Sequence, residues 1–257
     1  MLVSITFDDG NEYQYNGFFP ILEKYDLKGT FYIVTSWIGQ QGILNWDQLA
    51  ELHSGGNEIG SHTHTHRNLT NLSKEALDFE LHTSFTFLNR FDCKTLAYPN
   101  GGYNSLVIGY AKKYYIGARA YFMDKAHFHV SKMNESYSLI GLATEESSTS
   151  GTIPLLNLPF DKFEKEIIKL TKGGSDNWTI LVFHGQQITA KVFLGSVKTF
   201  VENGRALNVS LIKNSLRSSI AYGNTLKKFQ WLCKYLARND NLETVTVSDG
   251  IKKLYGG

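Results

Sequence analysis

The chain alternates between short apolar runs with strand periodicity and longer segments with helical periodicity. A strand is indicated where β-branched and aromatic residues alternate with polar ones or form a short continuous apolar run. These patterns predict strands over Leu2–Phe7, Thr30–Val34, Glu58–Ser61, Thr95–Tyr98, Ile116–Phe122, Ile180–Phe183 and Glu243–Val247. The run Ile180–Phe183 is apolar throughout, as buried parallel strands are.

Helices are indicated where apolar residues recur every three or four positions. Asn45 and Ser73 precede two of these stretches and are predicted N-caps. The predicted helices are Phe18–Tyr25, Trp46–His53, Ser73–Leu88, Val107–Tyr115, Phe163–Leu170, Leu226–Leu236 and Asp249–Tyr255. About seven β/α units follow, which implies a parallel sheet with right-handed crossovers. Both an irregular barrel and a doubly wound sheet fit this alternation, and chemistry gathers at the carboxyl ends of barrel strands.

Composition narrows the classes of partner. The 257 residues are 42% hydrophobic and 13% aromatic, enough for a large core, and the formal net charge is only +2. With no basic run, the sequence gives no reason to expect nucleic acid or an anionic membrane as partner, and without a glycine-rich phosphate loop it does not suggest phosphate binding. No apolar run reaches the roughly 18 residues of a membrane span. The N-terminus lacks the basic start of a signal peptide, so a cytoplasmic protein is expected, with a trimmed secreted form as the alternative.

One domain is expected over residues 1–257. Residues 186–224 lack a clear period and are predicted to be an insertion, which either packs on itself at the surface, covers the active site or forms a dimer contact. Cys93 and Cys233 lie in apolar segments and are predicted to be buried free thiols, although a single disulfide is the alternative. The sequence leaves the oligomeric state open.

Three polar clusters follow predicted strands. Asp8 and Asp9 come after the first strand, and adjacent carboxylates are costly unless a cation or a proton relieves them. His62 and His66 follow the third strand at a spacing that brings two imidazoles to one metal if the segment turns helically. His184 follows the buried strand Ile180–Phe183.

Each cluster alone has an ordinary explanation: a turn, a solvated loop or a structural histidine. Their joint occurrence is more specific, because a parallel barrel brings the carboxyl ends of its strands together. Two histidines and one carboxylate form a zinc site that keeps an open position for water.

These residues resemble the polysaccharide deacetylases, the NodB-homology domain of carbohydrate esterase family four. Thr6–Gly10 is similar to the first motif of that family and His62–His66 to the second. Ala97–Gly101 resembles the third motif in altered form, and Trp178–His184 resembles the last. Similar segments between the motifs are Phe19–Leu22, Gly29–Phe31 and Gly56–Ser61. The fold that this resemblance implies is a distorted (β/α)7 barrel of the TIM-barrel type.

The resemblance also implies roles. Asp9, His62 and His66 would bind a divalent metal, with Zn²⁺ as the expected ion. Asp8 would be the general base and His184 the general acid in removal of an N-acetyl group from an amino sugar or polysaccharide. His64 falls on a variable position between the metal ligands.

Two departures from the family pattern stand out. The third motif usually carries an arginine that orients the base, and the corresponding position here is Ala97. We therefore hypothesise that Arg119, on the next predicted strand, holds Asp8. The acid-aromatic motif that supports the histidine is not evident, since Asp124 lacks the pattern. Gly185 stands where an acidic residue usually follows the catalytic histidine.

Substrate contacts are predicted at positions around these motifs. A backbone N–H near Asn100 is a candidate oxyanion donor. Aromatic rings are candidates for stacking on sugars, or are core residues. The candidates for substrate or oxyanion contact are Tyr98, Pro99, Asn100, Arg119 and Trp46. Two other functions stay open: hydrolysis of an O-acetyl ester or a small amide at the same metal site, and a catalytically inactive carbohydrate-binding relative.

Overall fold

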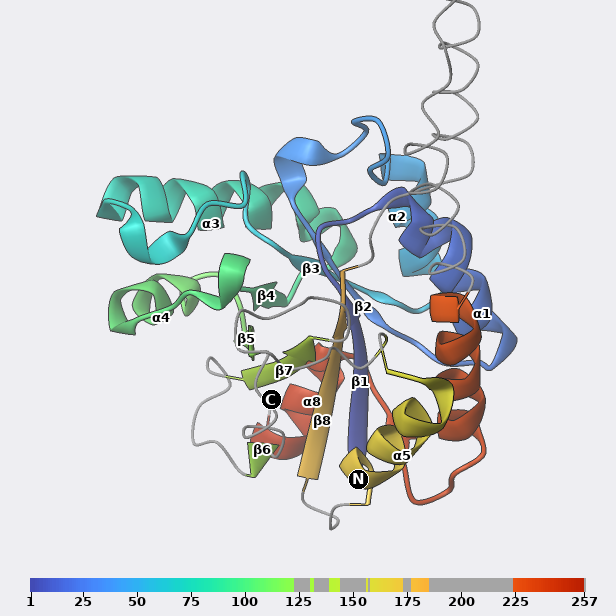
Figure 1. Cartoon of the computed structure of the whole chain (residues 1–257). Helices are drawn as coiled ribbons and strands as arrows, with labels where there is room; N and C mark the ends of the chain where they lie inside the picture. The colour runs from blue at the N-terminus through green and yellow to red at the C-terminus, as the bar shows by residue number, and fades with distance from the viewer. Residues whose placement is uncertain are drawn as a thin grey trace, which may run out of the picture.

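A computed structural model shows a curled, mostly parallel sheet surrounded by helices (Figure 1). The structure describes residues 1–122, 130–131, 139–143, 156, 158–172, 177–184 and 224–256. Within them, nine strands form one sheet in the order β6-β8-β7-β5-β4-β3-β2-β1-β9. The strands are β1 (Leu2–Phe7), β2 (Thr30–Ile33), β3 (Glu58–Ser61), β4 (Thr95–Ala97), β5 (Gly117–Phe122), β6 (Val130–Ser131), β7 (Leu139–Ala143), β8 (Asn177–Phe183) and β9 (Glu243–Thr244).

The sheet closes on itself because β8 also pairs with β1. The two strands are parallel, and the pairing covers the whole length of β1. The register joins Leu2 to Trp178 and Phe7 to Phe183. Seven described strands, β1 to β5 with β7 and β8, thus form a parallel ring, while β6 and β9 lie outside it. The predicted (β/α)7 barrel is confirmed, and the doubly wound sheet that also fitted the pattern is wrong.

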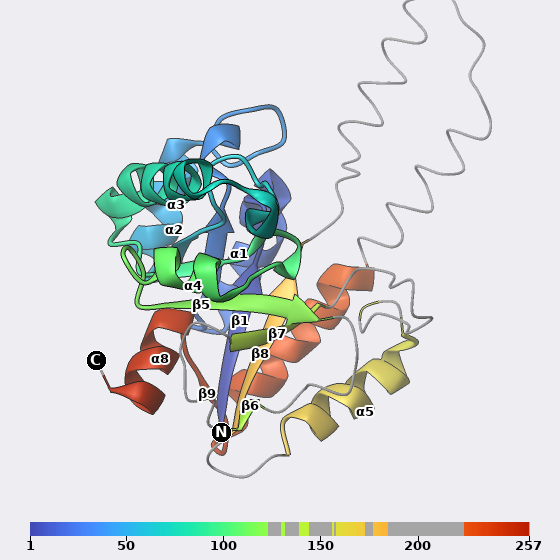
Figure 2. The ribbon, with the colours of Figure 1, turned by 90° about the vertical axis from the view of Figure 1, so that its left-hand side faces the viewer.

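Helices surround the ring on its outer side (Figures 1 and 2). They are α1 (Phe19–Lys24), α2 (Trp46–Ser54), α3 (Lys74–Leu88), α4 (Ser105–Ala111), α5 (Phe160–Leu170), a helix over residues 224–237, and α8 (Val247–Tyr255). Shorter turns are η1 (Gln14–Phe18), η2 (Thr35–Trp37), η3 (Leu69–Asn71), η4 (Asn89–Phe91) and η5 (Pro99–Gly101). Both predicted N-caps are confirmed: Asn45 forms a capping box with Gln48, and Ser73 accepts from the N–H of Ala76.

Alternation along each strand divides its residues between two environments. Val3, Ile5 and Phe7 of β1 pack outward in the main core, among rings that include Phe31 and Phe183. The opposite face of the ring is more polar, because it carries buried side chains such as Ser4, Thr6, Thr30, Thr95 and Arg119. The interior of the barrel therefore contains polar side chains that the strands hold in fixed positions.

Helix α8 covers the end of the barrel where the strands begin. Its residues pack with Leu2 and Trp178, near the starts of β1 and β8. The predicted start at Asp249 is wrong by two residues, because the strand β9 ends at Thr244 and Thr246 caps the helix by accepting from the N–H of Asp249. The hydroxyl of Thr30 accepts the N–H of Val247 at 3.0 Å, so tertiary contacts satisfy the early amides.

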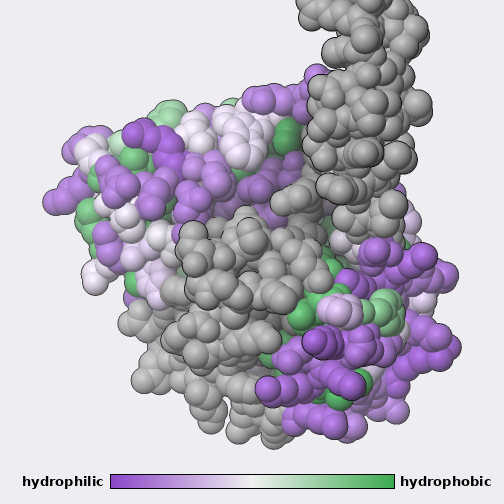
Figure 3. Space-filling model, in the orientation of Figure 1, coloured by the Kyte–Doolittle hydropathy of each residue, from purple (hydrophilic) through white to green (hydrophobic). Residues whose placement is uncertain are grey.

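The exposed helix faces in the orientation of Figure 1 are mostly hydrophilic, with scattered apolar residues (Figure 3). Among the described helices, none combines the length and the apolar character needed to cross a bilayer. Cys93 and Cys233 are buried free thiols, as predicted. Asp124 and all but the last residue of the predicted insertion at 186–224 lie outside the described residues, so those predictions stand as made.

Candidate active site

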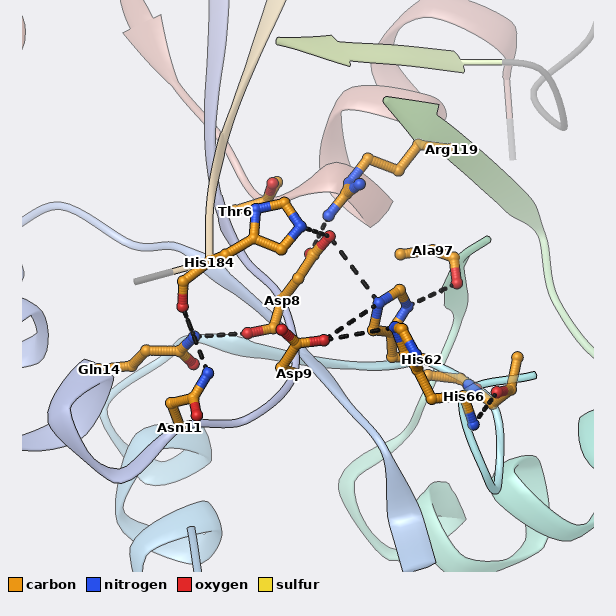
Figure 4. Close-up of polar contacts among 12 residues, drawn as sticks. Thr6, Asp8, Asp9, Asn11, Gln14, His62, His66, Ala97, Arg119 and His184 are labelled. Atoms are coloured by element: carbon orange, nitrogen blue, oxygen red, sulfur yellow. Dashed lines mark hydrogen bonds and ion pairs between the residues drawn. The ribbon is translucent and has the colours of Figure 1, made fainter. Parts of the chain in front are cut away.

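The first two carboxylates lie at the carboxyl end of β1. Asp8 continues the strand pairing, since its N–H donates to the carbonyl of Phe183 at 2.9 Å. Asp8 shares the inward face with Ser4 and Thr6, and by alternation Asp9 would point outward. Instead, Asp9 has a φ of 74°, a left-handed conformation that aspartate tolerates better than most residues. This turn brings both carboxylates to the same site (Figure 4).

The two histidines of the second cluster meet through a loop, not through a helical turn. Thr63 and His66 have φ values of 66° and 61°, and the rings of His62 and His66 lie 4.8 Å apart. Each left-handed residue costs about 1–2 kcal/mol relative to ordinary backbone. Such strain persists only where the surroundings hold the chain in place. The predicted meeting of the rings is found, but the helical geometry expected for it is wrong.

Asp9, His62 and His66 together have the donor atoms of a metal site. Their candidate ligand atoms all lie within 4.8 Å of one another. Asp9 Oδ1 is 3.6 Å from His62 Nε2 and 3.5 Å from His66 Nε2, and among the described residues this buried oxygen has no hydrogen-bond donor. A buried carboxylate oxygen without a donor fits a cation bound between it and the two rings.

The tautomer of His62 agrees with that arrangement. His62 Nδ1 is 2.8 Å from the carbonyl of Ala97, which can only accept, so Nδ1 carries the proton. The lone pair of Nε2 therefore faces Asp9. Burial lowers the pKa of His62 to about 4, against the attraction of Asp8 and Asp9, which keeps the ring neutral and able to bind a metal at pH 7.

His184 reaches the site from the end of β8, next to β1 in the ring. Its Nε2 lies 3.6 Å from Asp8 Oδ2, and 13% of its side chain is exposed. The carbonyl of His184 accepts from Gln14 Nε2 at 2.9 Å, from Asn11 Nδ2 at 3.4 Å and from the hydroxyl of Tyr13. Gln14 also donates to the carbonyl of Asp8 at 2.5 Å. The loop after β1 thus ties the two strand ends together.

Arg119 is completely buried and forms an ion pair with Oδ1 of Asp8. Arg119 lies in the middle of β5, directly beside Ala97 in the pairing with β4. The guanidinium also lies over the ring of Tyr32 at 4.6 Å. The contact hypothesised for Arg119 is therefore present. The charge sits one strand over from the position where the family pattern has its arginine.

The environment of Asp8 favours the ionised carboxylate. Burial alone would raise its pKa, but the Arg119 guanidinium, with smaller contributions from His62 and His184, holds the pKa below its ordinary value. Among the described residues, Asp8 Oδ2 has no hydrogen-bond donor, while Oδ1 is taken by Arg119. The carboxylate is held by one oxygen and presents the other to the histidines.

The remaining predicted contact residues lie in different surroundings. Tyr98 is buried and its ring stacks on Tyr103 at 5.2 Å, which favours a core residue, one of the two alternatives left open for it. Trp46 packs between helices α2 and α3, against Phe87 and Phe91. Pro99 is buried in η5, whereas Asn100 is exposed with a φ of 55°.

Sequence reasoning missed two sets of supporting residues. Asn11, Tyr13 and Gln14 hold the carbonyl of His184, and nothing in their pattern distinguishes them from a polar turn. Glu80 is 1% exposed and binds the loop between the two histidines. Its signal was available, because Glu80 falls on the buried stripe of α3 beside Leu77 and Leu81.

Fold and site together define a seven-stranded β/α barrel with an Asp-His cluster at the carboxyl ends of its strands. Residues 1–118 match the family model described as Polysaccharide deacetylase. Over these residues the chain is similar to the polysaccharide deacetylase family, and the resemblance drawn from the motifs is confirmed.

Two relatives with similar names match part of the chain. The putative polysaccharide deacetylase YxkH of Bacillus subtilis is 35% identical over 114 residues, which cover 43% of this chain and 41% of that protein. A poly-β-1,6-N-acetyl-D-glucosamine N-deacetylase of Staphylococcus aureus is 32% identical over 128 residues, covering 43% of this chain and 44% of that protein. The chain thus spans about two fifths of the length of the curated relatives it matches.

Solved structures match over nearly the whole chain and show the fold. The Xyl-CE4 domain of a multidomain xylanase from the hindgut metagenome of Trinervitermes trinervoides is 18% identical, with a TM-score of 0.58 over 98% of this chain and 90% of that one. A family 4 carbohydrate esterase from Streptomyces lividans is 14% identical, with a TM-score of 0.58 over 95% of this chain and 91% of that one.

Proposed function

We propose that this chain is a metal-dependent hydrolase that removes N-acetyl groups from an amino sugar or polysaccharide. The observation that carries the proposal is the position of Asp8. Its carboxylate is held by Arg119, faces His184 and lies beside the Asp9–His62–His66 cluster. A base, an acid and a set of metal ligands thus converge at one end of the barrel.

Asp9, His62 and His66 would hold the cation. One carboxylate and two imidazoles are a donor set that zinc prefers in sites with an open position. When bound, the metal polarises the acetyl carbonyl and lowers the pKa of the attacking water. Because the fit rests on a buried oxygen of Asp9 without a donor, Asp9 is the ligand whose removal tests the site most directly.

Asp8 is the general base in this proposal. Arg119 occupies Oδ1, so Oδ2 is the oxygen that takes a proton from water as the oxygen of that water bonds to the acetyl carbon. A carboxylate whose pKa lies below its ordinary value is ionised at neutral pH and ready to accept that proton. Arg119 keeps the accepting oxygen in one orientation.

His184 is the general acid. The C–N bond of the amide breaks only as the amine gains a proton, and a histidine is suited to donate it near neutral pH. His184 and His62 lie on different sides of Asp8 (Figure 4). The proton acceptor and the proton donor therefore both reach a substrate placed between them. The proton that Asp8 accepted then passes to His184, which restores both groups, and the products are acetate and the protonated amine.

The relatives favour an N-acetylated glycan as the substrate. The Staphylococcus aureus relative is named for N-deacetylation of poly-β-1,6-N-acetyl-D-glucosamine. An amide also needs the acid more than an ester does, because an amine is the poorer leaving group. The pairing of His184 with Asp8 therefore suits an amide.

The test is to measure metal content and acetate release on the same preparations. Purified protein would be loaded with zinc, analysed for bound metal, and incubated with β-1,6- and β-1,4-linked N-acetylglucosamine oligomers. Asp9→Ala removes the proposed ligand, and Asp161→Ala, an exposed acid on α5, is the control. We expect about one zinc per chain and acetate release in the wild type and control, and neither in Asp9→Ala.

Other outcomes would redirect or end the proposal. Zinc without acetate release from the oligomers would move the substrate to O-acetyl esters or small amides, for which a substrate panel with His184→Ala is informative. Folded wild-type protein that binds no zinc and releases no acetate would refute the catalytic proposal and favour an inactive carbohydrate-binding relative.

A further inference from the structure

The loop that carries the two histidine ligands has an unusual backbone and an unusual partner. Thr63 and His66 both adopt left-handed φ values, and neither is a glycine. A residue other than glycine adopts a lower-energy backbone conformation unless neighbouring groups hold it in the left-handed one. The distance between His62 and His66 therefore depends on whatever holds the residues between them.

Glu80 of α3 holds this loop from beneath. Its Oε2 accepts the N–H of His64 at 3.0 Å and the N–H of Thr65 at 2.8 Å, and its Oε1 accepts the hydroxyl of Thr65. The carboxylate is 1% exposed and lies between the buried residues Leu77 and Ser84 on one helix face. Both of its oxygens are thus used on two consecutive loop residues.

Other contacts hold the loop through different groups, including the His64 ring, whose Nδ1 lies 2.9 Å from Thr35 Oγ1. The N–H of Thr35 donates to the carbonyl of Thr63 at 3.2 Å, and the N–H of Ser36 donates to the carbonyl of His64 at 2.9 Å. These bonds hold carbonyls, whereas Glu80 is the acceptor for the N–H groups of His64 and Thr65. Without Glu80, two partly buried donors between the histidines would lose their acceptor.

Burial of the Glu80 carboxylate costs free energy unless other groups compensate for the lost hydration. Among the described residues, no lysine or arginine forms an ion pair with Glu80, so the loop donors carry its stabilisation. A leucine would suit the helix face better if packing were the only demand. A carboxylate at this position accepts three hydrogen bonds from His64 and Thr65, which a leucine could not do.

We propose that Glu80 is a positioning residue: it fixes the 63–66 loop and so sets the separation of the two imidazoles that would bind the metal. This inference rests on the proposed function. Glu80 contacts residues between the two histidines and is not one of the proposed ligands. It acts through the backbone, as groups outside the ligand set of a metal site do when they orient the ligands.

The experiment measures zinc affinity of the full chain, by competition with a chromophoric chelator, for variants of Glu80. Glu80→Ala removes all three bonds, and Glu80→Asp keeps the charge but is one methylene too short to reach them together. We expect each to weaken zinc binding by about 10- to 100-fold. Glu80→Gln keeps an oxygen for the two N–H groups, so its zinc affinity should stay close to that of the wild type.

Glu58 offers a matched control. Like Glu80, it accepts three hydrogen bonds, from Thr30, Thr95 and the N–H of Ser248, but it lies at the end of the barrel that α8 covers. Glu58→Asp should leave zinc affinity unchanged. The absorption spectrum of the cobalt-loaded protein adds a readout of ligand geometry. It should change in Glu80→Asp and stay constant in Glu58→Asp.

The outcomes separate the two proposals. Wild-type protein that fails to bind zinc refutes the proposed function together with this inference. Wild-type protein that binds zinc, alongside folded Glu80→Asp with the same affinity and the same cobalt spectrum, refutes the role of Glu80 alone. If Glu80→Ala does not fold, Glu80→Asp and Glu80→Gln still decide the question.

Discussion

The two ends of this barrel each enclose a carboxylate, and they treat it in opposite ways. At the end where the strands begin, both oxygens of Glu58 accept hydrogen bonds, from Thr95 at 2.6 Å and from Thr30 and Ser248 at 3.0 Å each. At the end where the strands finish, Asp8 is held by Arg119 through one oxygen, and its other oxygen has no donor among the described residues.

The difference shows that one end of the barrel contributes to the stability of the fold, while the other end carries the candidate active site. At the α8 end, Glu58 and Thr30 have hydrogen-bond partners, and these bonds join a helix to the strands. At the other end, Asp8 and Asp9 are held in place, but each keeps one oxygen without a hydrogen-bond donor among the described residues. A site that binds a ligand or a metal needs such unoccupied polar atoms. The same division is general for β/α barrels, whose active sites lie at the carboxyl ends of the strands.

The sharpest test of this contrast exchanges each carboxylate for its amide. Asp8→Asn removes the proposed base, so acetate release should fall by about 10²–10⁴-fold while zinc is still bound. Glu58→Gln should keep the wild-type rate. Steady-state kinetics with metal analysis would check both. Equal losses of rate in the two variants would contradict the contrast.

Removing Arg119 should affect both stability and rate. Arg119→Ala leaves the buried Asp8 carboxylate without its partner, which typically costs about 3–5 kcal/mol of unfolding free energy. Arg119→Lys keeps the charge but loses the planar donors, so an intermediate loss is expected. Urea unfolding measures the stability, and the rate at saturating substrate measures the effect on Asp8. A fully stable Arg119→Ala protein would show that the ion pair contributes little.

Crowding the α8 end should lower stability alone. A Cβ at Gly250 would lie 2.4 Å from the Trp178 ring, too close for any real contact. Gly250→Ala should therefore destabilise the protein by about 1–3 kcal/mol, despite the better helix propensity of alanine. Thermal unfolding and kcat would be compared with wild type. A large fall in kcat at temperatures where the variant is folded would show that the two ends are coupled.

The smallest expected effect is a pH dependence. Burial raises the pKa of Glu58 above its ordinary value of 4.5, although its three donors oppose the shift. The folded state then binds a proton more tightly than the unfolded chain does. This stabilising contribution is present below the unfolded pKa and is lost as the pH rises through the folded pKa.

Glu58→Gln has no titrating group at this position, so its stability relative to wild type should rise as the pH increases from about 4.5. Urea unfolding of both proteins between pH 4 and pH 8 would measure this difference. A difference that stays constant with pH would show that the pKa of Glu58 is the same in the folded and unfolded states.

Much of the fold followed from local patterns. The strands of the first half and the caps of α2 and α3 depend on residues within a few positions, and the structure has them where the patterns predicted. Helix α8 begins two residues earlier than its local pattern predicts, because Thr30 and Glu58 satisfy its first amides from distant strands. Ring closure through β8 and β1 likewise depends on pairing that no local pattern encodes.

The candidate site was predictable as a set of residues but less so as a geometry. Asp8, Asp9, His62, His66 and His184 lie together because each follows a strand end. The left-handed backbone of Asp9 and of the 63–66 loop could not be inferred from spacing. The contact of Arg119 could only be hypothesised, because its register beside Ala97 is a property of the folded sheet.

The pairing of β1 with β8 also bears on how the polypeptide is made. The first strand emerges from the ribosome well before β8, because Leu2 pairs with Trp178 and Phe7 pairs with Phe183. Contacts so distant in sequence form slowly, and an unpaired strand edge exposed in the meantime is a place where nascent chains associate. Expression yield should therefore depend on how quickly residues 177–183 are translated and on chaperones that shield β1 until they arrive.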